Sequence, residues 1–245
     1  LIRVFTLIFV QDVEFTHGVL LGLATFTMIT GVLGAASQFE IRTILSFHII
    51  SQIGYMIMGL GLFTHLAIAG TIFYLIHHMI VKTNLFLVGG VILHLKGSTH
   101  LKRIGGLYKE RPLLCILFMI PAMSLAGVPP LSGFFAKFIL IVAALKAEQW
   151  LVCGVGLFVG LVTLYSMTKI WANGFWAEQP IEQNKIKPIS NGKLFALLSP
   201  IVALALITIC IGFGAMFVFD FAERASALLL DRSFYVDHVL GGYIK

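Results

Sequence analysis

Ionisable side chains lie in the middle of long apolar stretches of this sequence, where they are costly to place. Lys82 is near the centre of the apolar run 66–95. In a membrane-spanning helix a central lysine costs about 2.5–3.5 kcal/mol on insertion scales, so we expect its ammonium to face a hydrated interior rather than lipid. Burial favours the neutral amine, and a lysine that can lose its charge is able to carry a proton.

Other polar side chains fall on the same helical face as Lys82. Tyr74, His78 and Lys82 follow one another at four-residue steps, which brings them onto one side of a helix. Histidine is the side chain whose ordinary pKa lies nearest to neutral pH, so this stripe is suited to passing protons. A hydrogen-bonded packing cluster is the alternative. His77 lies about 100° around the helix from His78; it is a further candidate for the path and would face Asn84.

The preceding apolar run carries a second polar stripe. Its members, which recur on one helical face at steps of three and four residues, are His48, Ser51, Gln52 and Tyr55. They could extend a hydrogen-bonded path for protons. Polar contacts between helices serve to hold ordinary membrane bundles together as well, so we keep both interpretations.

Lys137 is the second lysine deep inside an apolar run, and it follows Pro130 by seven residues. No Asp or Glu lies in the run that carries Lys82 or in the run that carries Lys137, so neither lysine has an obvious carboxylate partner within its own span. Two unpaired lysines indicate protonation that changes during a working cycle rather than a static salt bridge. Lys169 is a weaker candidate, because it lies near the end of its run and can snorkel to the headgroups.

The composition requires a membrane environment for these residues. The 245 residues are 59% hydrophobic and 11% charged, with a mean hydropathy of +0.99. Soluble domains carry about 25% charged residues, so this chain cannot cover a globule with a water-compatible surface. We therefore predict an all-α integral membrane protein. The net charge of +6 does not indicate nucleic-acid binding, because the cations are dispersed among loops instead of forming one basic face.

Apolar stretches bounded by charges or turn residues predict a single membrane domain over 1–245, a bundle of about seven transmembrane helices. The predicted spans are 1–10 (partial), 18–37, 44–63, 66–95, 112–146, 150–173 and 194–221. The chain begins with Leu1, and 1–10 is about half of the ~20 residues that cross a bilayer, so we expect a fragment cut inside a helix. Gly18/Gly22 and Gly156/Gly160 have the GxxxG spacing that permits close helix contacts.

The fifth span is too long for one continuous helix. At ~1.5 Å per residue, a helix over 112–146 would reach roughly 50 Å, against an apolar core of ~30 Å. Proline removes a backbone donor and clashes with the preceding turn, so Pro129 and Pro130 predict a break near 128–132. Broken membrane helices often mark ion pathways; a simple proline kink is the alternative.

The loops carry uneven positive charge, which predicts the orientation. The cations that fall on one side of the membrane are Arg42, Lys96, Lys102, Arg103, Lys109, Arg111, Lys185, Lys187 and Lys193. The opposite side has few, so the positive-inside rule makes the first side cytoplasmic. We expect a multi-pass protein of the cell membrane whose C-terminus lies on the non-cytoplasmic side.

Several kinds of chemistry have no visible motif in this sequence. There is no P-loop, Rossmann glycine pattern, HExxH or cysteine cluster, so we predict no nucleotide, flavin, zinc or iron–sulfur cofactor and no metal site. Cys115, Cys153 and Cys210 lie far apart inside apolar segments. No loop is long enough for a soluble catalytic domain, and we expect a transporter subunit rather than an enzyme.

Three motifs resemble the antiporter-like subunits shared by Mrp-type sodium/proton antiporters and respiratory complex I, and the Mrp D type most closely. Arg42–Met56 reads RTILSFHIISQIGYM, Leu75–Gly90 reads LIHHMIVKTNLFLVGG, and Gly105–Lys137 runs from GGLYKERP to SLAGVPPLSGFFAK. The resemblance implies a fold of fourteen helices in which two inverted repeats each form a half-channel, and this chain resembles the second half. It also implies that His78, Lys82 and Lys137 belong to the proton path.

The function implied by the resemblance is that of a proton-translocating subunit of a multisubunit monovalent cation (Na⁺)/proton antiporter, assembled with other membrane subunits of an Mrp-type complex. Protons would pass between Lys82 and Lys137 through His78 and water, because the proton affinity of each lysine depends on the charge of the other. One alternative is a proton-pumping membrane-arm subunit of a complex I-like NADH–quinone oxidoreductase or a membrane hydrogenase. Another is a structural membrane subunit that conducts nothing.

Overall fold

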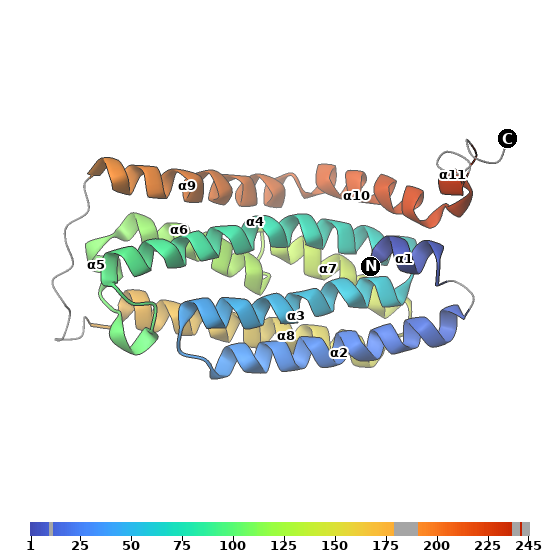
Figure 1. The fold of residues 1–245 in the computed structure, drawn as a ribbon, viewed down its shortest axis with the longest axis horizontal. Helices are drawn as coiled ribbons and strands as arrows, with labels where there is room; N and C mark the ends of the chain where they lie inside the picture. The colour runs from blue at the N-terminus through green and yellow to red at the C-terminus, as the bar shows by residue number, and fades with distance from the viewer. Residues whose placement is uncertain (10–11, 179–190, 237–240, 242–245) are drawn as a thin grey trace.

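The computed structural model describes residues 1–9, 12–178, 191–236 and 241, and nearly all of them are helical. Within these residues the only β pairing is an isolated bridge between Glu40 and His100. The long helices lie side by side along one axis (Figure 1), and five of them are long and apolar enough to cross a membrane. The predicted all-α membrane fold is confirmed.

Four long helices form the body of the bundle. They are α2 (Val13–Ser37), α3 (Ile41–Leu62), α4 (His65–Lys96) and α8 (Trp150–Ile170). Short connections between α2, α3 and α4 make each helix antiparallel to the one before it (Figure 1). A π-helical segment, Trp171–Trp176, continues α8. The shorter elements are α1 (Ile2–Leu7), η1 (Leu101–Arg103), α5 (Leu107–Glu110) and α11 (Arg232–Tyr235).

The fifth apolar run forms two half-length helices, α6 (Pro112–Ala126) and α7 (Ser132–Lys146). Helix α6 ends because Gly127 takes a φ of +95°, a left-handed conformation that glycine adopts without steric cost. The two prolines that follow have no N–H to continue the ladder. The interruption thus covers 127–131, against an expectation of 128–132, and both half-helices contact α4 (Figure 1).

The single span expected over 194–221 is wrong, because the structure has two helices there. Helix α9 (Asn191–Phe213) and helix α10 (Ala215–Leu230) meet at Gly214 and lie end to end along one side of the bundle (Figure 1). In the sequence, Asp220 and Glu223 end the apolar run. They do not end the helix, because an amphipathic helix carries charged residues on its polar face.

Glycines allow close packing at some helix contacts and not at others. A Cβ on Gly31 of α2 would overlap the backbone of Ser51 on α3, so these two helices touch at backbone distance. Gly18 and Gly22 have open space around them, and their GxxxG spacing makes no such contact. Gly156, in the second predicted pair, does face a neighbouring helix.

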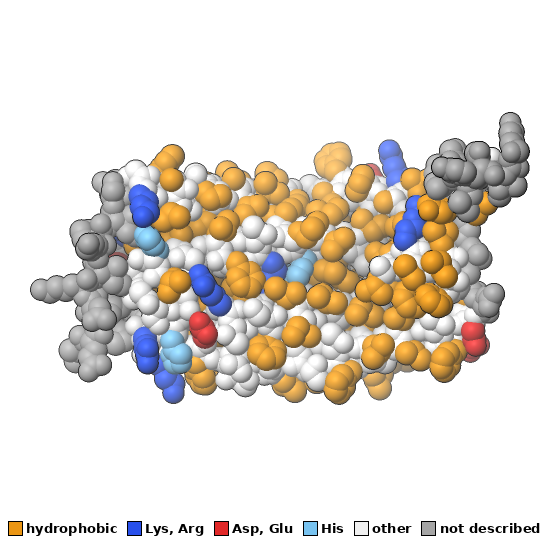
Figure 2. Space-filling view, in the orientation of Figure 1, with side chains coloured by type: hydrophobic (Ala, Val, Ile, Leu, Met, Phe, Trp, Pro, Cys, Tyr) orange, Lys and Arg blue, Asp and Glu red, His pale blue; other side chains and the backbone are white. Residues whose placement is uncertain are grey.

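On the face that Figure 2 shows, most charged side chains lie at the two ends of the bundle, and apolar side chains cover much of the length between them. The end that carries the α2–α3 and α4–α5 loops has most of the Lys and Arg visible on this face (Figure 2). An ion pair is also at this end, with Lys96 Nζ 2.8 Å from Glu110 Oε1. The bundle therefore has the belt of apolar surface that a membrane-spanning protein needs.

Candidate functional site

The helix break gives Lys137 its position. Its side chain reaches back from α7 across the break, and Nζ donates to the carbonyl of Ala126, the last residue of α6, at 3.1 Å. Nζ also lies 5.3 Å from the centre of the Tyr55 ring. The carbonyl end of a helix and the face of an aromatic ring both attract a cation. Lys137 is only 9% exposed, so a neutral carbonyl and a ring replace most of its water.

Glycines on α8 leave room beside Lys137. A cavity of about 290 Å³ is lined by this lysine, Tyr55, Gly156 and Gly160, among others. The Tyr55 hydroxyl donates to the Gly156 carbonyl, which ties α3 to α8. A Cβ added to Gly160 would lie 4.0 Å from Lys137 Nζ. A larger side chain at that position would fill the space next to the ammonium.

Lys82 is also held by a backbone carbonyl of a neighbouring helix. Its Nζ donates to the carbonyl of Leu45 on α3 at 2.9 Å, and the residue is 5% exposed. Lys82 and His78 line a groove of about 620 Å³ with other side chains of α4 and with Ile49 of α3. Figure 2 shows Lys/Arg and His side chains in the middle of this otherwise apolar face.

The two polar stripes on α3 and α4 meet between the lysines. The rings of Tyr55 and Tyr74 stack with centres 5.3 Å apart, and the Tyr74 hydroxyl donates to Gln52 Oε1. The ring of His78 lies 6.5 Å from that of Tyr74. A line of polar groups thus begins at Lys137 and passes the two tyrosines and Gln52. It leads toward the turn of α4 that carries His78 and Lys82.

Several buried nitrogen atoms along this line have no hydrogen-bond partner among the described residues. They are Nδ1 and Nε2 of His48, Nε2 of Gln52, Nε2 of His77 and Nε2 of His78. Buried polar atoms nearly always have a partner, because leaving one unpaired costs about 1–3 kcal/mol. Bound water is the usual partner where the protein offers none. The atoms therefore mark a region that requires water.

Two sequence candidates lie away from this polar line. Ser51 donates to the carbonyl of Met28 on α2 at 3.1 Å, so it contributes to the packing of α2 on α3. Lys169 donates to the carbonyls of Ala36 at 2.7 Å and Gln38 at 2.6 Å. Instead of reaching outward to headgroups, its ammonium binds the carbonyl end of α2, where a cation is favourable.

His77 faces the helix break and not Asn84, so its predicted direction is wrong. Its Nδ1 lies 2.8 Å from the hydroxyl of Ser132, and that hydroxyl lies 3.0 Å from the hydroxyl of Ser124. Asn84 donates to the carbonyl of Ile201 on α9 at 3.3 Å. The two serines are site residues that sequence reasoning missed. The available signal was a hydroxyl residue on each side of the proline-containing interruption.

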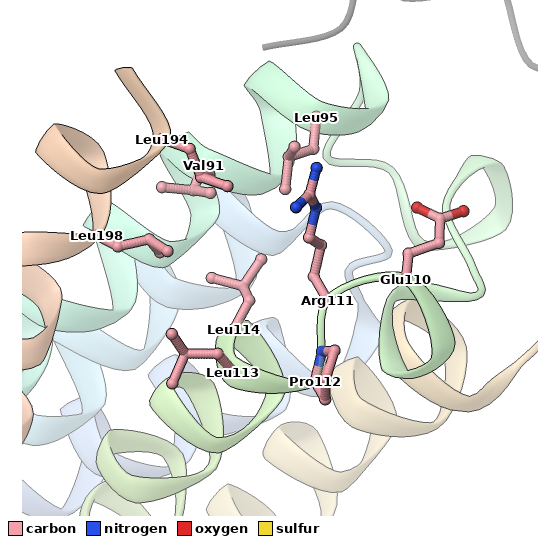
Figure 3. Close-up of a pocket in the computed structure, with 9 residues that line it drawn as sticks. All are labelled: Val91, Leu95, Glu110, Arg111, Pro112, Leu113, Leu114, Leu194 and Leu198. Carbon is pink, nitrogen blue, oxygen red and sulfur yellow. The ribbon is translucent and has the colours of Figure 1, made fainter. Parts of the chain in front are cut away.

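A further pocket lies apart from both lysines, where the ends of α4, α6 and α9 meet (Figure 3). It has a volume of about 200 Å³ and is lined mainly by leucines, with Glu110 and Arg111 at its edge. Glu110 accepts a hydrogen bond from Lys96 at 2.8 Å. No group of three His, Cys, Asp or Glu close enough to hold a metal occurs among the described residues.

Comparisons with known proteins place these features in a family. Residues 1–163 match the family described as NADH:quinone oxidoreductase/Mrp antiporter, TM. The chain is 50% identical over 240 residues to the D subunit of the Na(+)/H(+) antiporter of Alkalihalophilus pseudofirmus, a match that covers 98% of this chain and 48% of that protein. It is 36% identical over 238 residues to the protein of the same name in Bacillus subtilis, with 97% and 48% covered. The chain spans about half the length of these curated relatives.

Solved structures give the same assignment of fold. A chain of the Mrp complex from Dietzia sp. superposes with a TM-score of 0.88 and 34% identity, over 98% of this chain and 52% of that one. A chain of respiratory complex I from Thermus thermophilus superposes with a TM-score of 0.76 and 24% identity, over 94% and 49%; this second likeness concerns the fold alone. The resemblance predicted from the three motifs is confirmed.

Proposed function

Because this chain belongs to the NADH:quinone oxidoreductase/Mrp antiporter transmembrane family, we propose that it is a proton-translocating subunit of a multisubunit Na⁺/proton antiporter. The relatives at 50% and 36% identity are named as antiporter subunits, which favours this function over that of a redox-driven pump. Matches to respiratory complexes stand at 24% identity, where only the fold is shared.

The observation that carries the proposal is the kind of partner that each buried lysine has. Lys82 and Lys137 donate to backbone carbonyls and to no carboxylate among the described residues. A carbonyl accepts a hydrogen bond from an ammonium and from a neutral amine alike. Each lysine can therefore lose its proton and keep its hydrogen bond. In a salt bridge, loss of the same proton would leave the partner carboxylate as an unpaired buried anion.

The polar line between the lysines supplies the route for the proton. We place water at the unpartnered nitrogen atoms of His48, Gln52 and His78, so that hydrogen-bonded groups connect the turn of Lys82 with Gln52 and Tyr74. Water in the cavity that Tyr55 and Lys137 line would complete the path. A charge on one lysine disfavours a charge on the other, so the two titrate as a coupled pair. Arrival of a proton at Lys82 then promotes release from Lys137, or the reverse.

We assign sodium binding to parts of the assembly other than this polar line. Hard cations prefer several oxygen ligands, and the unpartnered atoms of the line are nitrogen atoms. The groove at Lys82 supports assembly with further membrane subunits, because an ammonium in contact with lipid is costly. We place the positively charged end of the bundle in the cytoplasm and the C-terminus on the opposite side of the cell membrane.

Replacing each lysine in the assembled antiporter tests the proposal. We expect Lys82→Ala and Lys137→Ala to abolish Na⁺-driven proton movement in everted membrane vesicles, with normal amounts of complex. Lys146→Ala is the matched control, because Lys146 is an exposed lysine at the end of the same helix as Lys137, and it should transport normally. Retained transport in either buried-lysine variant would rule out the proposed route.

A further inference from the structure

A chain of hydrogen bonds joins three helices at the break. The backbone N–H of Gly133 donates to Ser124 Oγ at 3.2 Å, the hydroxyls of Ser124 and Ser132 lie 3.0 Å apart, and Ser132 Oγ lies 2.8 Å from His77 Nδ1. The three side chains are at most 1% exposed. This chain of hydrogen bonds, which we call the break lock, connects α6, α7 and α4.

The backbones at the break lock are in direct contact, so the two half-helices have little freedom to rearrange. A Cβ on Gly133 would overlap the carbonyl oxygen of Ser124 and lie 2.9 Å from His77 Cε1. Helix α9 encloses the opposite side, where a Cβ on Gly212 would lie 2.5 Å from the carbonyl oxygen of Pro130. The interruption is thus a packed element with a fixed geometry and differs from a flexible hinge.

The break lock and Lys137 span the same interruption. Lys137 belongs to α7, but its ammonium binds Ala126 at the end of α6. That hydrogen bond has its 3.1 Å length only while the two half-helices keep their relative position. Ser124 precedes Ala126 on α6, and Ser132 begins α7, so the bonds between the serines fix the position on which the lysine depends.

The backbone end point of this hydrogen-bond chain argues against proton transfer through His77. The Gly133 N–H is a donor that cannot accept a proton, and it ends the chain that starts at His77 Nδ1. A histidine that relays a proton needs a continuing path at both ring nitrogens. Through Nδ1 the path from His77 stops at the backbone, whereas the neighbouring His78 lines the groove of Lys82.

We propose that His77 is a positioning residue, which holds the two half-helices through Ser132 and Ser124 so that the Lys137 ammonium stays on the Ala126 carbonyl, and that it does not carry the transported proton. The inference rests on the proposed function of Lys137. It assigns different tasks to two adjacent histidines and makes α4 the helix that both carries Lys82 and fixes the site of Lys137.

Two substitutions of His77 separate positioning from proton transfer. The amide of His77→Asn can bond the Ser132 hydroxyl from nearly the position of Nδ1, but it takes up no proton at neutral pH. We expect this variant of the assembled complex to transport within about threefold of the wild type in everted vesicles. His77→Leu removes the bond and should lower transport about tenfold, the effect of ~1.4 kcal/mol.

The serine variants and the pH profile test the mechanism behind the loss. Ser132→Ala should match His77→Leu, and the double variant should be no slower than either one, because both remove a single interaction. Ser166→Ala is the matched control, since Ser166 is a buried serine that bonds within its own helix; it should behave like the wild type. The pH profile of His77→Leu should move by about half a unit or more because the acceptor of Lys137 has moved, whereas a smaller amount of folded complex would only scale the profile.

Three results would overturn the assignment. Transport by His77→Asn that is as slow as transport by His77→Leu, at equal amounts of complex, would make His77 a proton carrier. Full activity of His77→Leu, together with loss of transport in Lys137→Ala, would show that transport does not depend on the break lock. The proposed function would then remain intact. Retained transport in Lys137→Ala would overturn both proposals, because the lock acts through that lysine.

Discussion

Two buried ammonium groups each donate to a backbone carbonyl, and the choice of a neutral partner decides what these lysines can do. A carboxylate would stabilise the charged form and retain the proton. The carbonyls of Leu45 and Ala126 accept from either form. Burial then opposes the charge and the hydrogen bond supports it, so neither form is favoured as strongly as it would be in a salt bridge.

Placing a carboxylate beside Lys137 should therefore stop its cycle. Gly160 is suited to this test because a Cβ there would lie 4.0 Å from Lys137 Nζ. We expect Gly160→Asp to slow Na⁺-driven proton transport at least about tenfold, since an ion pair of ~1.4 kcal/mol or more holds the proton. Gly160→Asn is the control of equal size and should be clearly faster. Equal rates for the two variants would show that size and not charge is responsible.

The hydrogen bond between Tyr74 and Gln52 should matter for stability as well as for transport. Tyr74→Phe leaves Gln52 Oε1 buried without its partner, which we expect to destabilise the protein by about 1–3 kcal/mol. The double variant Tyr74→Phe/Gln52→Leu should recover most of that stability and still transport poorly, because the polar line is interrupted. Thermal unfolding of the purified complex and vesicle transport measure the two effects. A double variant that transports normally would contradict the route.

Spacing in the sequence was sufficient to place Tyr74, His78 and Lys82 on one helical face, because a helix fixes the directions of its own side chains. It was not sufficient for His77. A residue 100° away from the stripe faces whichever helix packs there, and that is set by tertiary structure. The partner of Lys137 could not be predicted from the sequence either, because the Ala126 carbonyl is a backbone group that every residue type has.

At the scale of the helix, the interruption between α6 and α7 follows from local chemistry that a sequence displays. A left-handed glycine and two residues without N–H groups end a helix in any context. The junction of α9 and α10 has no such signal, since Gly214 has a negative φ and Pro200 lies fourteen residues before it, inside α9. Hydropathy also ends that span too early, because α10 continues as an amphipathic helix up to Leu230.

The close contact at the break makes a clear prediction for Gly133. We expect Gly133→Ala to lower the amount of assembled complex and its unfolding temperature, because the added methyl group would overlap the Ser124 carbonyl and overpacking costs about 1–3 kcal/mol. Gly154→Ala on α8 is the matched control, since nothing lies within 4 Å of its Cβ position. Unchanged stability of Gly133→Ala would mean that α6 and α7 are free to separate.

For the whole molecule, the distribution of charge predicts the orientation in the membrane. Lys109 and Gln149 are exposed at opposite ends of the bundle. In a variant without the natural cysteines, a single cysteine at either position reports the side of the membrane on which that end lies. A membrane-impermeant maleimide should label Gln149→Cys in intact cells and Lys109→Cys in everted vesicles alone. The opposite pattern would invert the proposed topology and the direction of transport with it.

The whole fold was the easiest level to predict, because the mean hydropathy and the lengths of the apolar runs leave helices as the only structure. What the chain does depends instead on a few polar atoms, and the proposed proton route requires water between Lys82 and Lys137. The most direct measurement is a cryo-EM map of the assembled antiporter that resolves ordered water elsewhere in the membrane domain. We predict density for water bound to His48, the Gln52 amide and His78. A dry, fully packed interior at these atoms would contradict the proton route.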